Sequence, residues 1–333
     1  MPAETKIEWT DHSWSPWRGC TKVSPGCANC YAESLSERFN RKDSDLPTWG
    51  GWGKGKPRVL AKNWGDPVKW NKAADAEQEM RMAYGKGNPP YAKTSFTVFP
   101  SLCDWLDEEV PIEWLARFLK LIYDTPNLTW LLLTKRPENF RNRLLKSMAG
   151  NWADPLDLTD RIHAWIDGSR IPRNVWVGTS VEDQPRADER IPALIEIPAV
   201  GRFLSVEPMI GPVDLRLFSR AFGFPKHITA DGRAIGMPQG IHWVIVGGES
   251  GPGARPCNVE WVRSIVNQCA GASVPCFVKQ LGAHPVGRWT ASPHESGLGE
   301  GWPAGLKVTH PKGGSPEEWP DDLRVRQFPE GIR

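Results

Sequence analysis

The sequence predicts an α/β protein built on a parallel sheet. From Thr94 onward, short apolar runs typical of buried strands alternate with amphipathic stretches of helical period. This alternation favours strands that run parallel, each joined to the next through a helix. Polar side chains also collect directly after the apolar runs. The carboxyl ends of barrel strands carry such residues, because α/β enzymes build their active sites there.

Each predicted element follows from a local pattern. Apolar residues recur at three- and four-residue spacing from Trp114 to Ile122, which predicts a helix with Pro111 in its first turn. Further helices are expected through residues 140–144 and 261–269. The strands are expected at residues 94–99, 128–133, 175–178, 202–204, 242–246 and 276–278, after a short first strand at residues 7–9.

Length and composition narrow the class of protein. A chain of 333 residues can bury a substantial core. Charged residues make up 24% and the net charge is +2, so any basic surface for a partner must be local. Seven cysteines, an odd number, follow a polar and aromatic N-terminus, which predicts a reducing cytoplasm. No apolar run approaches the length that spans a bilayer, so no membrane partner is expected.

Residues 19–33, GCTKVSPGCANCYAE, carry three cysteines, Cys20, Cys27 and Cys30, in the spacing C-x6-C-x2-C. An amphipathic run begins at Tyr31, which places Cys27 and Cys30 at a helix N-terminus. The helix dipole lowers a thiol's pKa there, and thiolates are the form that binds metals. Iron–sulfur clusters normally take four cysteines, so three would leave one iron open to a substrate or cofactor.

The same spacing allows other interpretations. A structural zinc ion could be held by the three cysteines with a fourth ligand such as His12. The Cys27–Cys30 pair could be a redox dithiol, or the three thiols could be packing residues. The other cysteines, Cys103, Cys257, Cys269 and Cys276, are expected not to bind the metal.

A basic, tryptophan-rich stretch follows the first helix, and its residues 40–91 are expected to be largely irregular. Residues 38–72 hold nine Lys and Arg against three Asp, with tryptophans interleaved. Cations alternating with flat rings suit a phosphate backbone with stacked bases, although the tryptophans could simply pin a solvated loop. The candidate nucleic-acid contacts are Trp52, Lys54, Lys56, Arg58, Lys62 and Trp64. Residues 50–57 resemble a P-loop, but Pro57 replaces the Ser or Thr that would meet magnesium.

The polar residues after the predicted strands are candidates for one shared site. A parallel sheet brings the carboxyl ends of its strands to one edge, so these side chains should converge beside the three cysteines. Those expected to bind a cofactor, a substrate or each other are Asp104, Lys135, Arg136, Ser180, Glu182, Glu207, Glu249, Arg255, Lys279 and Gln280.

With these motifs the chain resembles the phage-associated three-cysteine-motif proteins, which look related to radical S-adenosylmethionine (SAM) enzymes. The matching stretches are SWSPWRGCTKVSPGCANCYAE, LLLTKRP, NVWVGTSVE, RFLSVEPMIGP, WVIVGGESGPGARP, FVKQLG and EEWPDDLRVRQFP. The resemblance implies a partial parallel (β/α) barrel over residues 1–282 and an irregular extension over residues 283–333. Insertions in the barrel are expected at 40–91, 151–173 and 213–240.

The resemblance also implies a four-iron, four-sulfur (4Fe–4S) cluster on Cys20, Cys27 and Cys30, with SAM bound to the open iron. Reduction by an external electron donor would cleave SAM to a 5′-deoxyadenosyl radical, which takes hydrogen from a substrate. Two features depart from the usual pattern. The first cysteine gap is six residues where radical SAM enzymes have three, and Gly247, Gly248 and Glu249 follow a late strand, whereas the usual Gly-Gly-Glu follows the second. Ser101 and Asp104 stand after the second strand instead.

The sequence therefore favours a cytoplasmic radical SAM-type enzyme of a phage or prophage, acting on a nucleic acid or nucleobase. One alternative is a non-catalytic, metal-stabilised nucleic-acid-binding protein. Another is radical reversal of a DNA lesion, as in spore photoproduct lyase.

Overall fold

The computed structural model describes residues 5–40, 48–84, 96–149, 155–215, 240–287 and 308–332. Its centre is a seven-stranded sheet in the order β1-β4-β5-β6-β7-β8-β10, in which every neighbouring pair is parallel. The strands are β1 (His12–Ser13), β4 (Thr97–Phe99), β5 (Thr129–Thr134), β6 (Val175–Ser180), β7 (Gly201–Val206), β8 (Trp243–Gly247) and β10 (Cys276–Gln280). The predicted parallel α/β class is confirmed.

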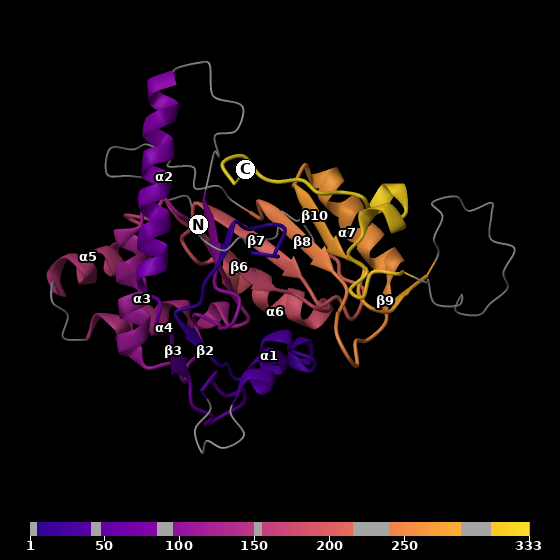
Figure 1. Ribbon diagram of the computed structural model, residues 1–333, viewed down its shortest axis with the longest axis horizontal. Coiled ribbons are helices and arrows are strands. Elements are labelled where there is room, and N and C mark those ends of the chain that lie inside the picture. The colour runs from indigo at the N-terminus through magenta and orange to yellow at the C-terminus, as the bar shows by residue number, and fades with distance from the viewer. Residues whose placement is uncertain are drawn as a thin grey trace, which may run out of the picture.

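The strands lie in the order in which the chain makes them, so the sheet winds in one direction and curls into a half-barrel (Figure 1). The connecting helices pack on one face of the sheet. Their apolar side chains form the main core there with strand residues such as Val98, Leu132, Val177 and Leu204. Fully burying one such side chain contributes about 1.5–3 kcal/mol. The helices are α3 (Ile112–Asp124), α4 (Phe140–Met148), α5 (Pro155–Ile166), α6 (Gln184–Ile195) and α7 (Val259–Ala272).

The opposite, inner face of the sheet is filled by aromatic side chains toward its N-terminal end. Phe203, Trp243 and Phe277 form a second core with Trp9 and Ile332, which come from the two ends of the described chain. Gly178 on β6 makes room for this layer, because a Cβ atom there would lie 2.5 Å from the Phe203 ring. The interior of the half-barrel is therefore packed toward the N-terminal end of its strands.

The C-terminal segment closes the free edge of the sheet beside β10. The amide of Val278 donates to Val325 O at 2.8 Å, and Gln327 N donates to Cys276 O at 2.8 Å. Arg326 then forms an ion pair with Glu8 at 2.7 Å, which joins the C-terminal segment to the N-terminal one. The smaller elements in this region are β9 (Cys257–Asn258), β11 (Pro285–Val286), η4 (Pro316–Glu318) and η5 (Asp321–Leu323).

The first strand is β1 (His12–Ser13), and the prediction of a strand at residues 7–9 was wrong. Trp9 instead turns into the inner core, with its ring 4.5 Å from that of Phe99. Asp11 is held against β4 by Thr97, whose amide donates to Asp11 Oδ2 at 2.8 Å. A short apolar segment that only packs its side chains into the core has the same sequence pattern as a strand that pairs through its backbone.

The expectation that residues 40–91 are largely irregular was also wrong for the described part. The 20-residue helix α2 (Gly65–Tyr84) projects from the body there, and β3 (Val59–Leu60) pairs antiparallel with β2 (Trp17–Arg18) (Figure 1). Residues 41–47 and 85–91 lie outside the described residues, as do residues 216–239 of the predicted insertion at 213–240. The predicted insertion at 151–173 contains α5.

Candidate functional site

The three-cysteine loop leads from the first part of the sheet into the helix predicted after it. Cys20 follows β2, Cys27 ends the short helix η1 (Pro25–Cys27), and Cys30 is the N-cap residue of α1 (Tyr31–Phe39). The Cys30 side chain makes no capping hydrogen bond, so its thiol is not used by the helix. All three cysteines are free and partly exposed.

Hydrogen bonds with three strand ends hold this loop against the C-terminal edge of the sheet. The amide of Gly26 donates to Glu182 Oε1 at 3.2 Å, and Asn29 Nδ2 donates to Glu249 Oε2 at 3.0 Å. Arg136 Nη2 donates to the carbonyl oxygen of Thr21. Because these partners follow β6, β8 and β5, the cysteine loop lies at the C-terminal edge of the sheet, the edge at which β/α enzymes build their active sites.

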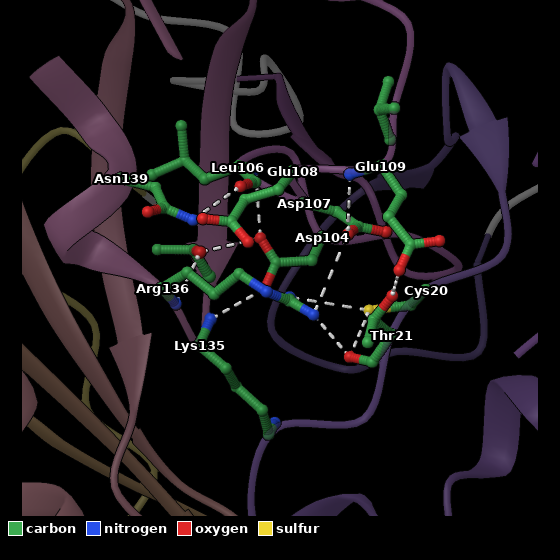
Figure 2. Close-up of polar contacts among 12 residues, drawn as sticks. Cys20, Thr21, Asp104, Leu106, Asp107, Glu108, Glu109, Lys135, Arg136 and Asn139 are labelled. Atoms are coloured by element: carbon green, nitrogen blue, oxygen red, sulfur yellow. Dashed lines mark hydrogen bonds and ion pairs between the residues drawn. The ribbon is translucent and has the colours of Figure 1, made fainter. Parts of the chain in front are cut away.

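A buried network of two arginines and two aspartates underlies Cys20. Figure 2 shows Arg136 of this network between Cys20 and Asp104. Arg136 Nη1 lies 2.8 Å from Asp104 Oδ2, and Arg58 Nη2 lies 2.8 Å from Asp107 Oδ2. All four side chains are at least nine-tenths buried. Each charge has an opposite partner, as a buried charge requires. Burial raises the pKa of Asp107, while Arg136 and Arg58 counteract that rise.

Glu182 and Glu249 hold the other side of the loop as charged groups. Burial would raise the pKa of Glu182, but Lys135 and Arg190 bring it below its ordinary value, with Arg190 Nη1 at 2.9 Å. Burial acts in the same way on Glu249, whose pKa is lowered mainly by hydrogen bonds from Arg255 at 2.6 and 2.8 Å. Both predicted cofactor residues therefore already have protein partners.

A second set of polar side chains faces the inside of the sheet at the same edge. Lys279 Nζ lies 2.7 Å from Glu207 Oε1, which also accepts from Gln280 Nε2 at 3.3 Å. Lys135 Nζ donates to Ser180 Oγ at 2.9 Å. The Glu207 and Lys279 side chains are 17% and 27% exposed, so a ligand can reach them.

Ser101 and the glycines predicted beside Glu249 have defined places at this edge. The Ser101 hydroxyl lies 2.5 Å from that of Ser13, and its carbonyl accepts from Tyr31 at 2.5 Å. Gly247 ends β8, and Gly248 packs so tightly that a Cβ atom would lie 2.3 Å from Leu281 O. Gly248 is thus required by packing.

The chemistry of the three thiols fits a metal or cluster, although their side chains do not yet surround one point. Lys22 interacts electrostatically with Cys27 and Cys30, and Arg136 Nη1 donates to Cys20 Sγ at 3.7 Å, so a cation lies near each sulfur. Burial and Asp104 nevertheless raise the pKa of the metal-free Cys20 thiol to about 12. Among the described residues, no three His, Cys, Asp or Glu side chains form a ready metal group. A bound cluster would require the thiols to turn toward one another.

The remaining cysteines lie apart from the loop or beside it. Cys257, Cys269 and Cys276 are fully buried in β9, α7 and β10. Cys103 forms an isolated backbone bridge with Gly19, next to Cys20. Burial raises the pKa of the Cys103 thiol well above its ordinary value.

The proposed nucleic-acid contacts separate into buried and exposed residues. Arg58 is 2% exposed and engaged with Asp107, so its guanidinium has no surface for a phosphate. Trp64 donates to Ala61 O at 2.8 Å and is covered by Arg117 at 4.0 Å from its ring. Trp52 forms an isolated bridge with Cys20. Those that remain exposed are Lys54, Lys56 and Lys62.

Residues 4–301 match the family described as "Protein of unknown function (DUF5131)". The chain belongs to this family. No curated protein and no solved structure matches it. Across the described part of this DUF5131 protein, no helix has both the length and the apolar character needed to cross a membrane.

Sequence reasoning missed several residues that build this DUF5131 site. Asn29 lies between two of the cysteines and contacts Glu249, so its place in the motif could have identified it. Arg190 and Asp107 belong to no motif that could have identified them, because Arg190 lies within α6 and Asp107 in a polar turn. The partner of Asp107, Arg58, is 49 residues away in the sequence, and that of Arg190, Glu182, is eight residues away across the connection from β6 to α6.

Proposed function

We propose that this protein is an iron–sulfur enzyme of the radical SAM type, with Cys20, Cys27 and Cys30 as cluster ligands. The observation that carries the proposal is the position of the cysteine loop. It follows β1, the first strand, and lies at the C-terminal edge of a parallel half-barrel whose strands follow in chain order. Three thiolates bind three irons of a cubane and leave the fourth for a cofactor. When bound, a reduced cluster with SAM supplies a carbon radical that abstracts hydrogen.

The polar side chains that face the inside of the sheet suit the charges of the methionine part of SAM. Glu207 offers a carboxylate to an ammonium group, while Lys135 and Lys279 offer ammonium groups to a carboxylate. We assign the first of these roles to Glu207 in preference to Glu249. Both Glu249 oxygens already accept hydrogen bonds from Arg255, and its side chain is only 4% exposed.

The proposed substrate is a nucleic acid or nucleobase, contacted through Lys54, Lys56 and Lys62. These three lysines are exposed and lie in the segment that pairs with the cysteine loop through Trp52. The triple change to Glu should weaken binding of single-stranded DNA and flatten its dependence on salt. Fluorescence anisotropy at several salt concentrations measures both effects. Changing Lys69, Lys72 and Lys120 to Glu is the control, because these lysines lie on α2 and α3.

Metal analysis after anaerobic purification tests whether the protein holds the proposed iron–sulfur cluster. We expect about four irons and four labile sulfides per chain, and a cluster signal by electron paramagnetic resonance after reduction. Changing all three loop cysteines to Ala should remove the iron, whereas Cys257→Ala and Cys269→Ala should retain it. Incubation with SAM and dithionite should release 5′-deoxyadenosine. Stoichiometric zinc without labile sulfide would refute the proposal and favour a structural metal site.

A further inference from the structure

We infer that Arg136 is a positioning residue for Cys20 that also tunes the cluster through its sulfur. This inference rests on the proposed function. The guanidinium donates from Nη1 to Cys20 Sγ at 3.7 Å and from Nη2 to the carbonyl of Thr21, so one side chain holds both the sulfur and the backbone after it (Figure 2).

Asp104 fixes the guanidinium in this position. Its carboxylate accepts from Leu106 N at 3.0 Å, Thr134 Oγ1 at 2.7 Å and Lys135 N at 2.8 Å, in addition to Arg136 Nη1 at 2.8 Å. A carboxylate with four donors cannot rotate without losing several of them. The cation beside Cys20 is therefore set in place by the fold.

The other two cysteines have different surroundings. Cys27 Sγ lies 3.7 Å from Ser24 Oγ, a neutral group on the same loop. Lys22, the cation that interacts with Cys27 and Cys30, is 42% exposed and paired with Glu33 at 2.6 Å. Because it is exposed and already paired, Lys22 should act only weakly on these two sulfurs, and salt should screen its charge. Among the described residues, the cluster would thus have one sulfur with a buried cation and two without.

A hydrogen bond and a positive charge at a ligand sulfur stabilise the more negative, reduced cluster. Both raise its reduction potential, because potentials depend on net charge and on hydrogen bonds to the sulfurs. Removing Arg136 should therefore make the cluster harder to reduce. Losing the iron altogether is not expected, because the loop keeps its attachments to Glu182 and Glu249.

Arg58 provides a matched control within the same network. It is as buried as Arg136, pairs with Asp107, and donates from Nη2 to the Thr21 hydroxyl at 2.6 Å. It contacts the residue after Cys20 and makes no described contact with the sulfur. A purely structural role would make the two arginines equivalent.

The experiment compares Arg136→Lys, Arg136→Gln and Arg58→Lys with the wild-type protein. Iron content and the midpoint potential, from redox titration followed by electron paramagnetic resonance, are measured for each. We expect near wild-type iron in all three, a clearly more negative potential in Arg136→Gln, a smaller shift in Arg136→Lys, and no shift in Arg58→Lys. An unchanged potential in iron-loaded Arg136→Gln, or an equal shift in Arg58→Lys, would overturn the inference.

Hydrogen exchange of the metal-free protein separates this inference from the proposed function. Loss of a hydrogen bond to a charged group should speed exchange in the peptide containing Cys20 and Thr21 by about tenfold or more in Arg136→Gln. Unchanged exchange there would remove the positioning role. A wild-type protein without iron would refute the proposed function and the tuning role, and the exchange result would still decide whether Arg136 holds the loop.

Discussion

The two ends of the central sheet satisfy their buried polar groups in different ways. At the N-terminal end, Arg202 donates to the nearby Ile197 carbonyl, and Asn174 donates to carbonyls at the end of α3. At the C-terminal end, carboxylates bind a loop more than a hundred residues earlier in the chain, as in the Gly26–Glu182 and Asn29–Glu249 contacts. At one end these side chains bond to backbone carbonyls at the ends of nearby elements, whereas at the other end carboxylates bond to a loop more than a hundred residues away and assemble a site.

The largest effect is expected at the C-terminal end from Glu182→Ala. The substitution leaves Arg190 buried without its carboxylate, and breaking a buried pair in this way costs about 3–5 kcal/mol. Urea unfolding followed by circular dichroism measures the loss. A change below about 1 kcal/mol would mean that Arg190 finds water or another partner, and that Glu182 does not anchor the loop.

At the N-terminal end we expect a pH effect centred on His242. Burial, and then the charge of Arg202, lower its pKa from 6.5 to about 4. The unfolded chain therefore binds a proton that the folded chain does not, so stability is complete above about pH 6.5 and falls as the pH drops toward 4. The loss is at most about 3 kcal/mol. Unfolding experiments between these pH values should show a flatter profile for His242→Asn, which keeps an acceptor for the Arg202 amide.

A smaller effect is expected from Glu249→Gln. The amide keeps the shape of the side chain but loses the charge that pairs with Arg255, which is 31% exposed. We expect a loss of about 1–2 kcal/mol in the free energy of unfolding, and faster hydrogen exchange around Asn29. The pKa of Glu249 is lowered on folding, so this difference should be present above about pH 5 and vanish as the pH falls through the folded pKa. A difference that persists in acid would contradict a charged role.

The smallest effect on stability is expected from Glu207→Gln. The Glu207–Lys279 pair is part-exposed, and such pairs contribute less than about 1 kcal/mol. Iron content should remain intact, while SAM binding, measured by equilibrium dialysis, should weaken. Normal SAM binding together with a large loss of stability would mean that Glu207 has a structural role, like Glu182 and Glu249. The distinction between carboxylates that hold the cysteine loop and those that face a ligand would then be lost.

The sequence was sufficient to predict the parallel architecture, because each strand of the sheet from β4 onward carries its own apolar run. The polar residues after these runs also identified the edge where the cysteine loop lies. The helix α2 was missed because, among its side chains with described burial, only Pro67, Trp70 and Ala74 are buried, which are too few to mark an apolar face. A projecting helix buries too little of its surface to show the usual pattern.

The partners of the site residues could not be predicted in the same way. Asp104, Glu182, Glu207 and Glu249 follow strands in similar patterns, yet only Glu207 remains available to a ligand. The difference depends on where Arg136, Arg190 and Arg255 fall in three dimensions. Spacing along the chain does not report which arginine reaches which carboxylate, even where the two are only six or eight residues apart.

The meeting of both chain ends in the inner aromatic core has a consequence for biosynthesis. Trp9 leaves the ribosome long before Ile332, so this core closes only after Ile332 has been synthesised. Contacts of such long sequence separation are slow to form. Until then, Phe277 and the β10 edge lack their covering segment. We therefore expect prematurely terminated chains to expose aromatic surface and an unpaired strand, two features that promote aggregation.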